Sequence, residues 1–319
     1  MGVIMDYIFC ARGVSSGAFA PRPGPTKFLE VPPGVMTLSP SLAIPRREWF
    51  DRVVALAETR RSPQGTPYGD VLIYIHGFNT SQSTVLERHR LIRNGLEALG
   101  YQGAVISFDW PSADSALNYL DDRTDAKLTA LRLVSDAIGP LSRYIQQGCE
   151  ISTHVLAHSM GAYVLREALD DADDRREIAA TGWTLNQVMI CSGDVSADSM
   201  GTTAKSSSLY RRSVRLTNYQ NPYDSVLSIS NVKRVGVSPR VGRIGLPASA
   251  PRKAVNVDVG LYYEQFRADF VGAFPDHNFY FQSAQFLKDV YLTLLGEIDR
   301  ESIPTRILRD GRLILRAER

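Results

Sequence analysis

The stretch that decides the fold covers residues 151–161 and reads ISTHVLAHSMG. It begins as an uncharged run rich in β-branched residues, which is typical of a buried strand, and then turns at A-H-S-M-G. A helical period follows, with apolar residues at positions 164, 165, 168 and 169. The pattern predicts a strand, a tight turn at Ser159 and a helix, which is the setting that exposes a nucleophilic serine above an α/β sheet.

Small residues flank this serine. Ala157 and Gly161 occupy the positions at which the G-x-S-x-G pattern has its glycines. They are needed there because the turn brings the strand and the helix close together. The helix start also directs backbone N–H groups toward developing negative charge. We therefore predict that Ser159 is a nucleophile.

Short apolar runs alternate with helical periods from about residue 70 onward. Such runs suit strands buried on both faces of a parallel sheet. The alternation predicts an α/β fold, with a mostly parallel doubly wound sheet, helices on both faces and no large lid domain. The expected strands cover residues 71–75, 104–108, 151–157, 185–191 and 214–217; the expected helices cover 85–99, 281–298 and 117–145, the last kinked or broken at Gly139-Pro140.

The two ends of the chain predict smaller features. Within residues 1–48 we expect antiparallel edge strands at 6–10 and 27–31, joined by an irregular loop rich in proline and glycine. Residues 300–319 predict a hairpin-like tail, because Asp310-Gly311 stands between two apolar runs. No repeat or linker is evident, so one domain over residues 1–319 is the simplest organisation.

A second chemical signal lies upstream, where residues 71–80 read VLIYIHGFNT. In such a sheet, two backbone N–H groups form the oxyanion hole beside the nucleophile. The loop that follows an earlier strand, here the one expected at 71–75, supplies one of them. The residue after the nucleophile supplies the other. The backbone N–H groups of Phe78 and Met160 are therefore the predicted oxyanion hole. The alternative is that His76-Gly77 is only a turn that ends a strand.

The general base follows by elimination among the five histidines. His89 lies in a polar helical stretch and is expected at the surface, and His154 is expected in the core. His76 and His158 adjoin the two motifs and are candidate pocket residues. His277 remains, in a loop-like stretch before the last long helix, and it fits the chain order serine, acid, histidine.

Two carboxylates compete for the role of the acid that orients the imidazole. Asp224 and Asp194 each follow an expected strand, and either could hold the base. We favour Asp224, because its loop should lie nearer to the loop of His277. Asp109 is a third carboxylate at a strand end and is expected to neighbour the pocket. Trp110, like Phe78, either lines a substrate subsite or packs in the core.

Composition excludes several classes of function. The net charge of +2 gives no sign of a nucleic-acid partner. The three cysteines are too few and scattered for a disulfide framework. No apolar run is long enough for a signal peptide or a transmembrane helix, so a cytoplasmic location is expected.

Residues 232–254 carry six basic residues and no acid, which predicts a solvated loop or a rim that attracts anions.

A metal site is not expected. The spacing His154-x-x-x-His158 would suit a pair on a helix, but on the expected strand the two residues stand about 13 Å apart. The HExxH glutamate is also missing. We predict no metal and no cofactor.

Four segments, IYIHGFNT, FDWPS, LAHSMG and YDSVL, occur in this order between residues 70 and 285. Their combination resembles a bacterial α/β-hydrolase family of the esterase or lipase type, long catalogued as a domain of unknown function. The resemblance implies that Ser159 is the nucleophile, Asp224 the acid and His277 the base. Arg243-Ile244-Gly245 resembles a further motif of that family.

This sequence departs from the family pattern in three ways. Asp109 stands where the family often has serine, which adds a charge near the expected pocket. Tyr163 is bulkier or differently polar than the residue expected there. Many relatives also carry a lipoprotein or secretory leader, which this sequence does not show.

The resulting hypothesis is a serine hydrolase that cleaves a small carboxylic ester through an acyl-enzyme on Ser159. The alternative is a hydrolase-fold protein that serves as a binding or scaffold component. Ester, amide and thioester cleavage stay open, as do acyl length, pathway and oligomeric state.

Overall fold

The computed structural model describes residues 4–112, 119–145, 150–232 and 238–318. Its centre is a 12-stranded sheet in the order β11-β12-β10-β9-β8-β7-β5-β6-β1-β2-β3, with β4 paired to β5. The strands are β1 (Asp6–Ser15), β2 (Ala18–Val31), β3 (Ala43–Ile44), β4 (Arg60–Arg61), β5 (Pro67–Ile75), β6 (Ala104–Asp109), β7 (Glu150–His158), β8 (Leu185–Cys191), β9 (Ser213–Gln220), β10 (Ala254–Asp258), β11 (Arg306–Arg309) and β12 (Arg312–Leu315).

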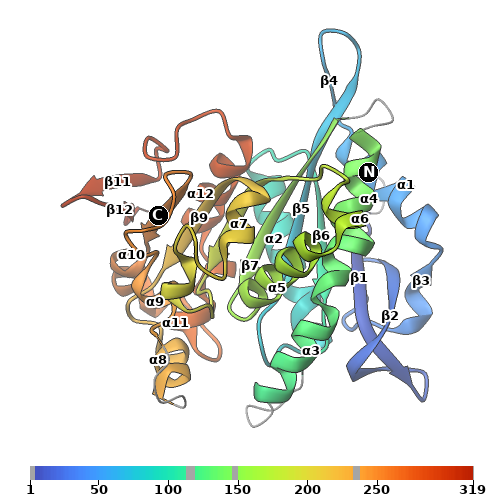
Figure 1. The fold of residues 1–319 in the computed structure, drawn as a ribbon, viewed down its shortest axis with the longest axis horizontal. Helices are drawn as coiled ribbons and strands as arrows, with labels where there is room; N and C mark the ends of the chain where they lie inside the picture. The colour runs from blue at the N-terminus through green and yellow to red at the C-terminus, as the bar shows by residue number, and fades with distance from the viewer. Residues whose placement is uncertain (1–3, 113–118, 146–149, 233–237, 319) are drawn as a thin grey trace.

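Helices cover both faces of this sheet (Figure 1). One face packs against α1, α3, α5 and α7, and the other against α2, α10 and α12. The helices are α1 (Arg46–Ala57), α2 (Gln82–Ala98), α3 (Tyr119–Arg132), α4 (Gly139–Ile145), α5 (Gly161–Asp174), α6 (Arg176–Ala179), α7 (Ser207–Arg211), α8 (Ser225–Val232), α9 (Val241–Ile244), α10 (Gly260–Phe266), α11 (Pro275–Asn278) and α12 (Ala284–Leu295).

The predicted fold class is confirmed. The strands from β1 to β12 through β6, β5, β7, β8, β9 and β10 pair in parallel. Among the strands of the described residues, antiparallel pairs occur at the two edges and at β4. The central strands are buried along nearly their whole length, which explains why they read as uninterrupted apolar runs.

The N-terminal edge is more regular than the sequence predicts. The expected irregular loop after residue 10 is wrong, because β1 and β2 form one long antiparallel hairpin. Its turn lies at Ser16 and Gly17, which both have positive φ. The prolines of β2 lie within residues 21–25, which β3 leaves unpaired and where the pairing with β1 shifts register between Cys10 and Gly13. Unpaired sides and bulges are the places where a strand tolerates the missing N–H of proline.

The helix expected over residues 117–145 is interrupted, as Gly139-Pro140 led us to expect. A π-helical segment, Leu133–Ile138, separates α3 from α4, and residues 117–118 lie outside the described residues. In a regular helix the ring of Pro140 would collide with the carbonyl of Asp136, four residues earlier. The wider π turn places that carbonyl differently.

The C-terminal hairpin is confirmed. Asp310 and Gly311 form its turn with φ of 51° and 73°, and β12 adds in parallel to β10. The hairpin is anchored to α12 by an ion pair between Arg306 and Asp289, whose side chains are fully buried.

The sheet also defines where a ligand should bind. β6 and β7 lie on opposite sides of β5, and their connecting helices α2 and α3 lie on opposite faces. Open α/β sheets bind ligands at such a switch point, beyond the carboxyl ends of the strands. The motifs at residues 76–80 and 158–161 stand at that place. In the described part of the chain, no helix is both long and apolar enough to cross a membrane.

Candidate active site

Ser159 occupies a strained turn between β7 and α5. Its φ is 54°, a conformation uncommon for residues with a side chain, and such strain is typical of a nucleophile turn. The backbone of Ser159 is held on both sides, by the last residue of β8 and by the loop that follows β8. Its N–H donates to the Cys191 carbonyl at 3.0 Å, and its carbonyl accepts from the Asp194 N–H at 3.0 Å.

The glycines near this turn have a steric reason. A Cβ on Gly161 would lie 2.7 Å from the His76 carbonyl oxygen, so only glycine lets α5 start this close to β5. A Cβ on Gly77 would lie 2.7 Å from the Ser159 Cβ and 3.3 Å from its Oγ. The loop after β5 therefore contacts the serine side chain directly.

The two expected oxyanion residues flank that contact. Phe78 follows Gly77 and is half-buried, and Met160 follows Ser159 and precedes the first turn of α5. Their backbones belong to the two segments that meet at the Ser159 hydroxyl.

Asp224 and His277 come together from distant parts of the chain. The Nδ1 atom of His277 lies 2.7 Å from Oδ2 of Asp224. Asp224 is fully buried, and its Oδ1 accepts a hydrogen bond from the Leu227 N–H at 2.9 Å. With Nδ1 bound to the carboxylate, Nε2 is the ring nitrogen left for proton transfer.

The segment that carries His277 is fixed by several hydrogen bonds. Nε2–H of His158 donates to the His277 carbonyl at 2.9 Å, and the two rings lie 4.7 Å apart. Asn221 Nδ2 donates to the Asp276 carbonyl at 2.7 Å. Arg88 donates to Oδ1 of Asn278 at 2.7 Å. These bonds place the imidazole beside the residue that precedes Ser159.

His158 acts in this arrangement as a neutral donor. Burial lowers its pKa well below the usual value, and the nearby His277 lowers it further. The ring therefore stays uncharged next to Ser159. The sequence predicted it only as a pocket residue, and its bond to the His277 carbonyl could not be read from the chain.

Asp194 pairs with an arginine. Its carboxylate forms an ion pair with Nε of Arg240 at 2.8 Å, and both side chains are buried. Its backbone N–H donates to the Ser159 carbonyl, so the residue borders the Ser159 turn. Of the two carboxylates between which the sequence left the choice open, Asp224 is the one in contact with His277.

Asp109 is enclosed beneath the loop after β5. Nε of Arg12 donates to its two carboxylate oxygens at 2.8 and 3.0 Å, and Cys10 Sγ and His76 Nε2 lie within 3.0 and 3.2 Å. Burial alone would raise the pKa of Asp109, but Arg12, His76 and Cys10 together lower it to about 2. Its charge is thus compensated inside the protein.

Arg12 is a residue that the sequence reasoning missed. Besides binding Asp109, it donates to the Thr80 carbonyl at 3.2 Å and the Ser112 carbonyl at 3.0 Å. It therefore ties together the loops that follow β5 and β6. Sequence offered no signal for this role, because Arg12 stands in the Pro- and Gly-rich region that predicted an irregular loop.

His76 and Trp110 support the same loop from within the core. Their rings stack at 5.3 Å, and Trp110 Nε1–H donates to the His76 carbonyl at 2.9 Å. Both side chains are fully buried, and burial lowers the pKa of His76. Of the two readings for Trp110, the structure places it in the core.

The remaining histidines, His89 and His154, have partners in the core. His89 is fully buried, with Nδ1 2.8 Å from Ser107 Oγ, so its expected surface position is wrong. The face of α2 that carries His89 packs on the sheet. His154 is a core residue as expected, with Nε2 3.0 Å from Asp70.

Comparison with known families decides the assignment. The model of a family described as "Alpha/beta hydrolase of unknown function (DUF900)" matches residues 57–280, which is more than half of the chain. The chain belongs to this family of α/β-hydrolases. The matched range includes β5, the Ser159 turn, Asp224 and His277.

Solved structures resemble the hydrolase only distantly. A protein assigned as a cell-surface hydrolase of Lactobacillus plantarum WCFS1 is 14% identical, with a TM-score of 0.38 over 72% of this chain and 92% of that one. Phospholipase PlaB from Legionella pneumophila is 13% identical, with a TM-score of 0.35 over 76% and 65%. A metagenome-derived lipolytic enzyme is 11% identical, with a TM-score of 0.30 over 60% and 83%. Comparison with curated proteins gave no match.

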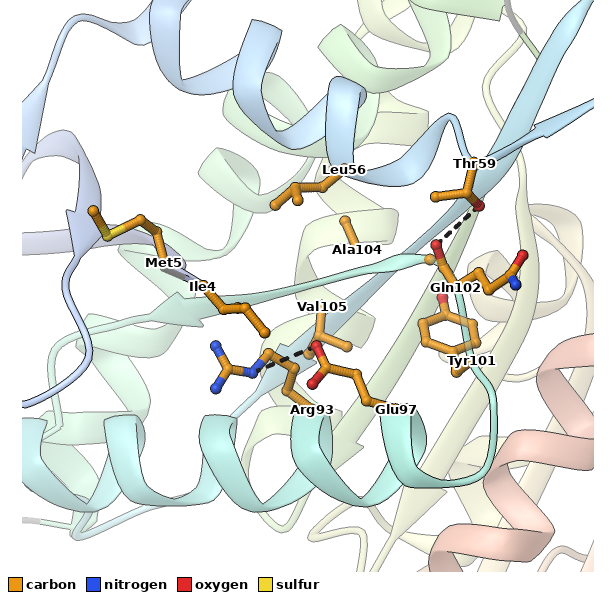
Figure 2. Close-up of a pocket in the computed structure, with 11 residues that line it drawn as sticks. Ile4, Met5, Leu56, Thr59, Arg93, Glu97, Tyr101, Gln102, Ala104 and Val105 are labelled. Atoms are coloured by element: carbon orange, nitrogen blue, oxygen red, sulfur yellow. Dashed lines mark hydrogen bonds and ion pairs between the residues drawn. The ribbon is translucent and has the colours of Figure 1, made fainter. Parts of the chain in front are cut away.

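A pocket of about 400 Å³ in the hydrolase lies away from Ser159, Asp224 and His277 (Figure 2). It is lined by Ala104 and Val105 at the start of β6, whereas Asp109 ends that strand near the candidate site. Arg93 and Glu97 of α2 and Tyr101 also line it, together with residues 4, 5, 56, 59, 102 and 103. Because the pocket is at the amino ends of the strands, it is separate from the Ser159 region.

The structure describes residues 232 and 238–254 of the basic stretch at 232–254. Residues 233–237 lie outside the described residues. Arg240 is buried against Asp194, so at least this cation is not part of an exposed rim. The residues Arg243-Ile244-Gly245 end α9, whose Gly242 packs on the backbone of Ser192.

Proposed function

We propose that this α/β-hydrolase is a serine hydrolase that cleaves small carboxylic esters through an acyl-enzyme on Ser159. The observation that carries the proposal is the Asp224–His277 pair. The two side chains are 2.7 Å apart, and the His277 ring lies 4.7 Å from the ring of His158, the residue before the strained turn of Ser159. A carboxylate, an imidazole and a serine so arranged are the parts of a general-base-activated nucleophile.

In this mechanism, His277 Nε2 accepts the Ser159 proton as Oγ attacks the ester carbonyl carbon. Asp224 keeps the other ring nitrogen protonated and stabilises the imidazolium. The imidazolium then protonates the departing alcohol. Water, activated by the same imidazole, attacks the acyl-enzyme, releases the carboxylic acid and restores Ser159.

The developing oxyanion needs donors that are already in place. We assign this role to the backbone N–H groups of Phe78 and Met160, on the two segments that meet at the serine hydroxyl. Loss of one such donor typically lowers kcat by about 10²–10³. The proposal requires no cofactor, because the protein supplies nucleophile, base and oxyanion donors.

The first test is labelling with a fluorophosphonate probe, mapped by mass spectrometry. We expect one adduct on Ser159 in the wild-type protein, and none in Ser159→Ala. His277→Ala should abolish labelling although the serine remains, since an unactivated serine reacts poorly with the probe. Folding of each variant is checked by its melting temperature.

A panel of esters with increasing acyl length, together with matched amides and thioesters, then defines the substrate. Preferred turnover of the esters supports the proposal. Well-folded wild-type protein that neither labels nor turns over any member would overturn the proposed chemistry and favour a binding or scaffold role.

A further inference from the structure

Ser192, directly after β8, contacts the acid of the proposed triad. Its Oγ donates a hydrogen bond to Oδ2 of Asp224 at 2.6 Å. This is the same oxygen that lies 2.7 Å from His277 Nδ1. Ser192 and Asp224 are both fully buried, so water cannot replace the hydroxyl at that oxygen without a rearrangement.

Tyr280 extends this contact into a chain of hydroxyl groups. Its OH lies 3.2 Å from Ser192 Oγ. A serine has a single hydroxyl proton, and here it is directed to the carboxylate, so the Tyr280 O–H donates to Ser192. Burial raises the pKa of Tyr280 well above its usual value, which keeps this donor protonated. Each bond in such a chain polarises the next.

The backbone at Ser192 is unusual in the same way as that at Ser159. Ser192 has a φ of 47°, a conformation that glycine would adopt with less strain. The preceding residue, Cys191, accepts the hydrogen bond from the Ser159 N–H. The end of β8 therefore contacts Ser159 through its backbone, and the residue that follows β8 contacts Asp224 through its side chain.

We propose that Ser192, oriented by Tyr280, is a positioning residue of the hydrolase. Its hydroxyl shares Oδ2 of Asp224 with His277, and so limits how tightly the carboxylate holds the imidazolium and fixes the orientation of the carboxylate. This inference rests on the proposed function, in which Asp224 and His277 act on Ser159.

Removal of the hydroxyl should have two measurable effects. With one donor fewer, more of the carboxylate charge is directed at His277, so the imidazolium persists to higher pH. The acid limb of the kcat/KM profile then moves to higher pH. The carboxylate is also less well oriented, and we expect kcat to fall about tenfold, which corresponds to the loss of one charge-assisted hydrogen bond.

The test compares Ser192→Gly with Ser192→Ala in ester hydrolysis measured from acid to alkaline pH. Glycine accepts the positive φ, so Ser192→Gly should keep the fold even if alanine is poorly tolerated. Tyr280→Phe should shift the acid limb in the same direction by a smaller amount, because it removes only the second donor of the chain.

Ser208→Ala is the matched control. Ser208 is also a buried serine, on α7, and its Oγ has no hydrogen-bond partner among the described residues. Its pH profile should equal that of the wild type. A second readout, the downfield proton NMR resonance of the His277–Asp224 hydrogen bond, should move in Ser192→Gly and stay in place in Ser208→Ala.

The outcomes separate the two proposals. Wild-type turnover with an unchanged profile and unchanged resonance in folded Ser192→Gly overturns the role of Ser192 alone. A wild-type protein without turnover or probe labelling overturns the proposed function, and this inference with it. A shifted acid limb that Ser208→Ala does not reproduce supports the positioning role.

Discussion

Ser159 and Gly77 contact each other at the place where the neighbouring strands β7 and β5 end. The serine turn has positive φ and projects its side chain toward the Gly77 backbone. A Cβ at position 77 would lie 2.7 Å from the Ser159 Cβ. The two loops can therefore lie this close only because Gly77 has no side chain.

The first prediction concerns Gly77→Ala. The added methyl group must displace either the serine or the predicted oxyanion loop, which ends at Thr80. We expect fluorophosphonate labelling to slow by about 10²-fold, the scale of losing an oxyanion donor. The rate is measured by gel fluorescence, with the melting temperature recorded in parallel.

Gly182→Ala serves as its control. A Cβ at Gly182 meets nothing within 4 Å, while its φ of 69° makes alanine strained by about 1 kcal/mol. This variant should lose some stability and label at the wild-type rate. Equal labelling of Gly77→Ala and wild type would contradict the assignment of this loop to the site.

At the scale of elements, a loop and a short helix from distant parts of the chain hold the Asp224–His277 pair. The loop after β9 carries Asp224, and α11 carries His277. Asn221 joins them, because its Nδ2 donates to the Asp276 carbonyl at 2.7 Å while its Oδ1 accepts from the Tyr223 N–H at 3.1 Å. Asn221 is fully buried, so both bonds are shielded from water.

The second prediction is that Asn221→Asp loosens this junction. The carboxylate keeps the acceptor for Tyr223 but sets an oxygen against the Asp276 carbonyl. We expect a loss of about 1–3 kcal/mol in the free energy of unfolding, the usual effect of a broken buried hydrogen bond. A displaced imidazole should lower kcat/KM about tenfold or more. Urea unfolding and ester kinetics measure the two effects.

Asn186→Asp provides the comparison. Asn186 donates to Ser152 Oγ at 2.8 Å near the opposite ends of β8 and β7. The serine can turn its hydroxyl toward the new carboxylate. Activity should therefore persist. If both variants lose activity equally, the junction at Asn221 has no special role.

For the whole molecule, the N-terminal strand pair completes the sheet and also supports the candidate site. β1 pairs in parallel with β6, and Arg12 on β1 reaches Asp109 and the loops after β5 and β6. The side chains of this ion pair are nearly or fully buried. Removal of one partner from a buried pair typically costs about 3–5 kcal/mol.

The third prediction concerns how stability changes with pH. The pKa of Asp109 is lowered from 3.8 to about 2, so its contribution is fully present above the unfolded value and is lost as pH falls from 3.8 toward 2. The stability difference between wild type and Asp109→Asn should therefore be constant near neutral pH. It should shrink by about 2 kcal/mol between pH 4 and 2.

Urea unfolding at several pH values measures this difference. The comparison with Asp109→Asn is needed because other acids, such as Asp6, also have a lowered pKa and contribute to acid unfolding of both proteins. A difference that stays constant down to pH 2 would contradict the account of the Arg12–Asp109 pair.

Much of the fold could be predicted because local pattern and tertiary role agree. The strands expected at 71–75, 104–108, 151–157, 185–191 and 214–217 lie within β5, β6, β7, β8 and β9. Such runs are apolar because both of their faces are covered. Of the strand β2, residues 27–31 were expected, but residues 18–26 were missed, since their prolines and glycine contradict a strand pattern and only pairing with β1 makes them extended.

The class of fold follows from the amino-acid pattern alone. So do the chemical types available: one serine in a strand–turn–helix segment, and a short list of histidines and carboxylates. Their catalytic roles remain predictions. The tertiary structure decided which of them meet. Asp224 contacts His277, Asp194 pairs with Arg240, Asp109 pairs with Arg12, and Ser192 joins the acid. The physical reason is range: hydrophobic periodicity acts over a few neighbouring residues, whereas these hydrogen bonds and ion pairs join segments up to about a hundred residues apart, which only the assembled sheet brings together.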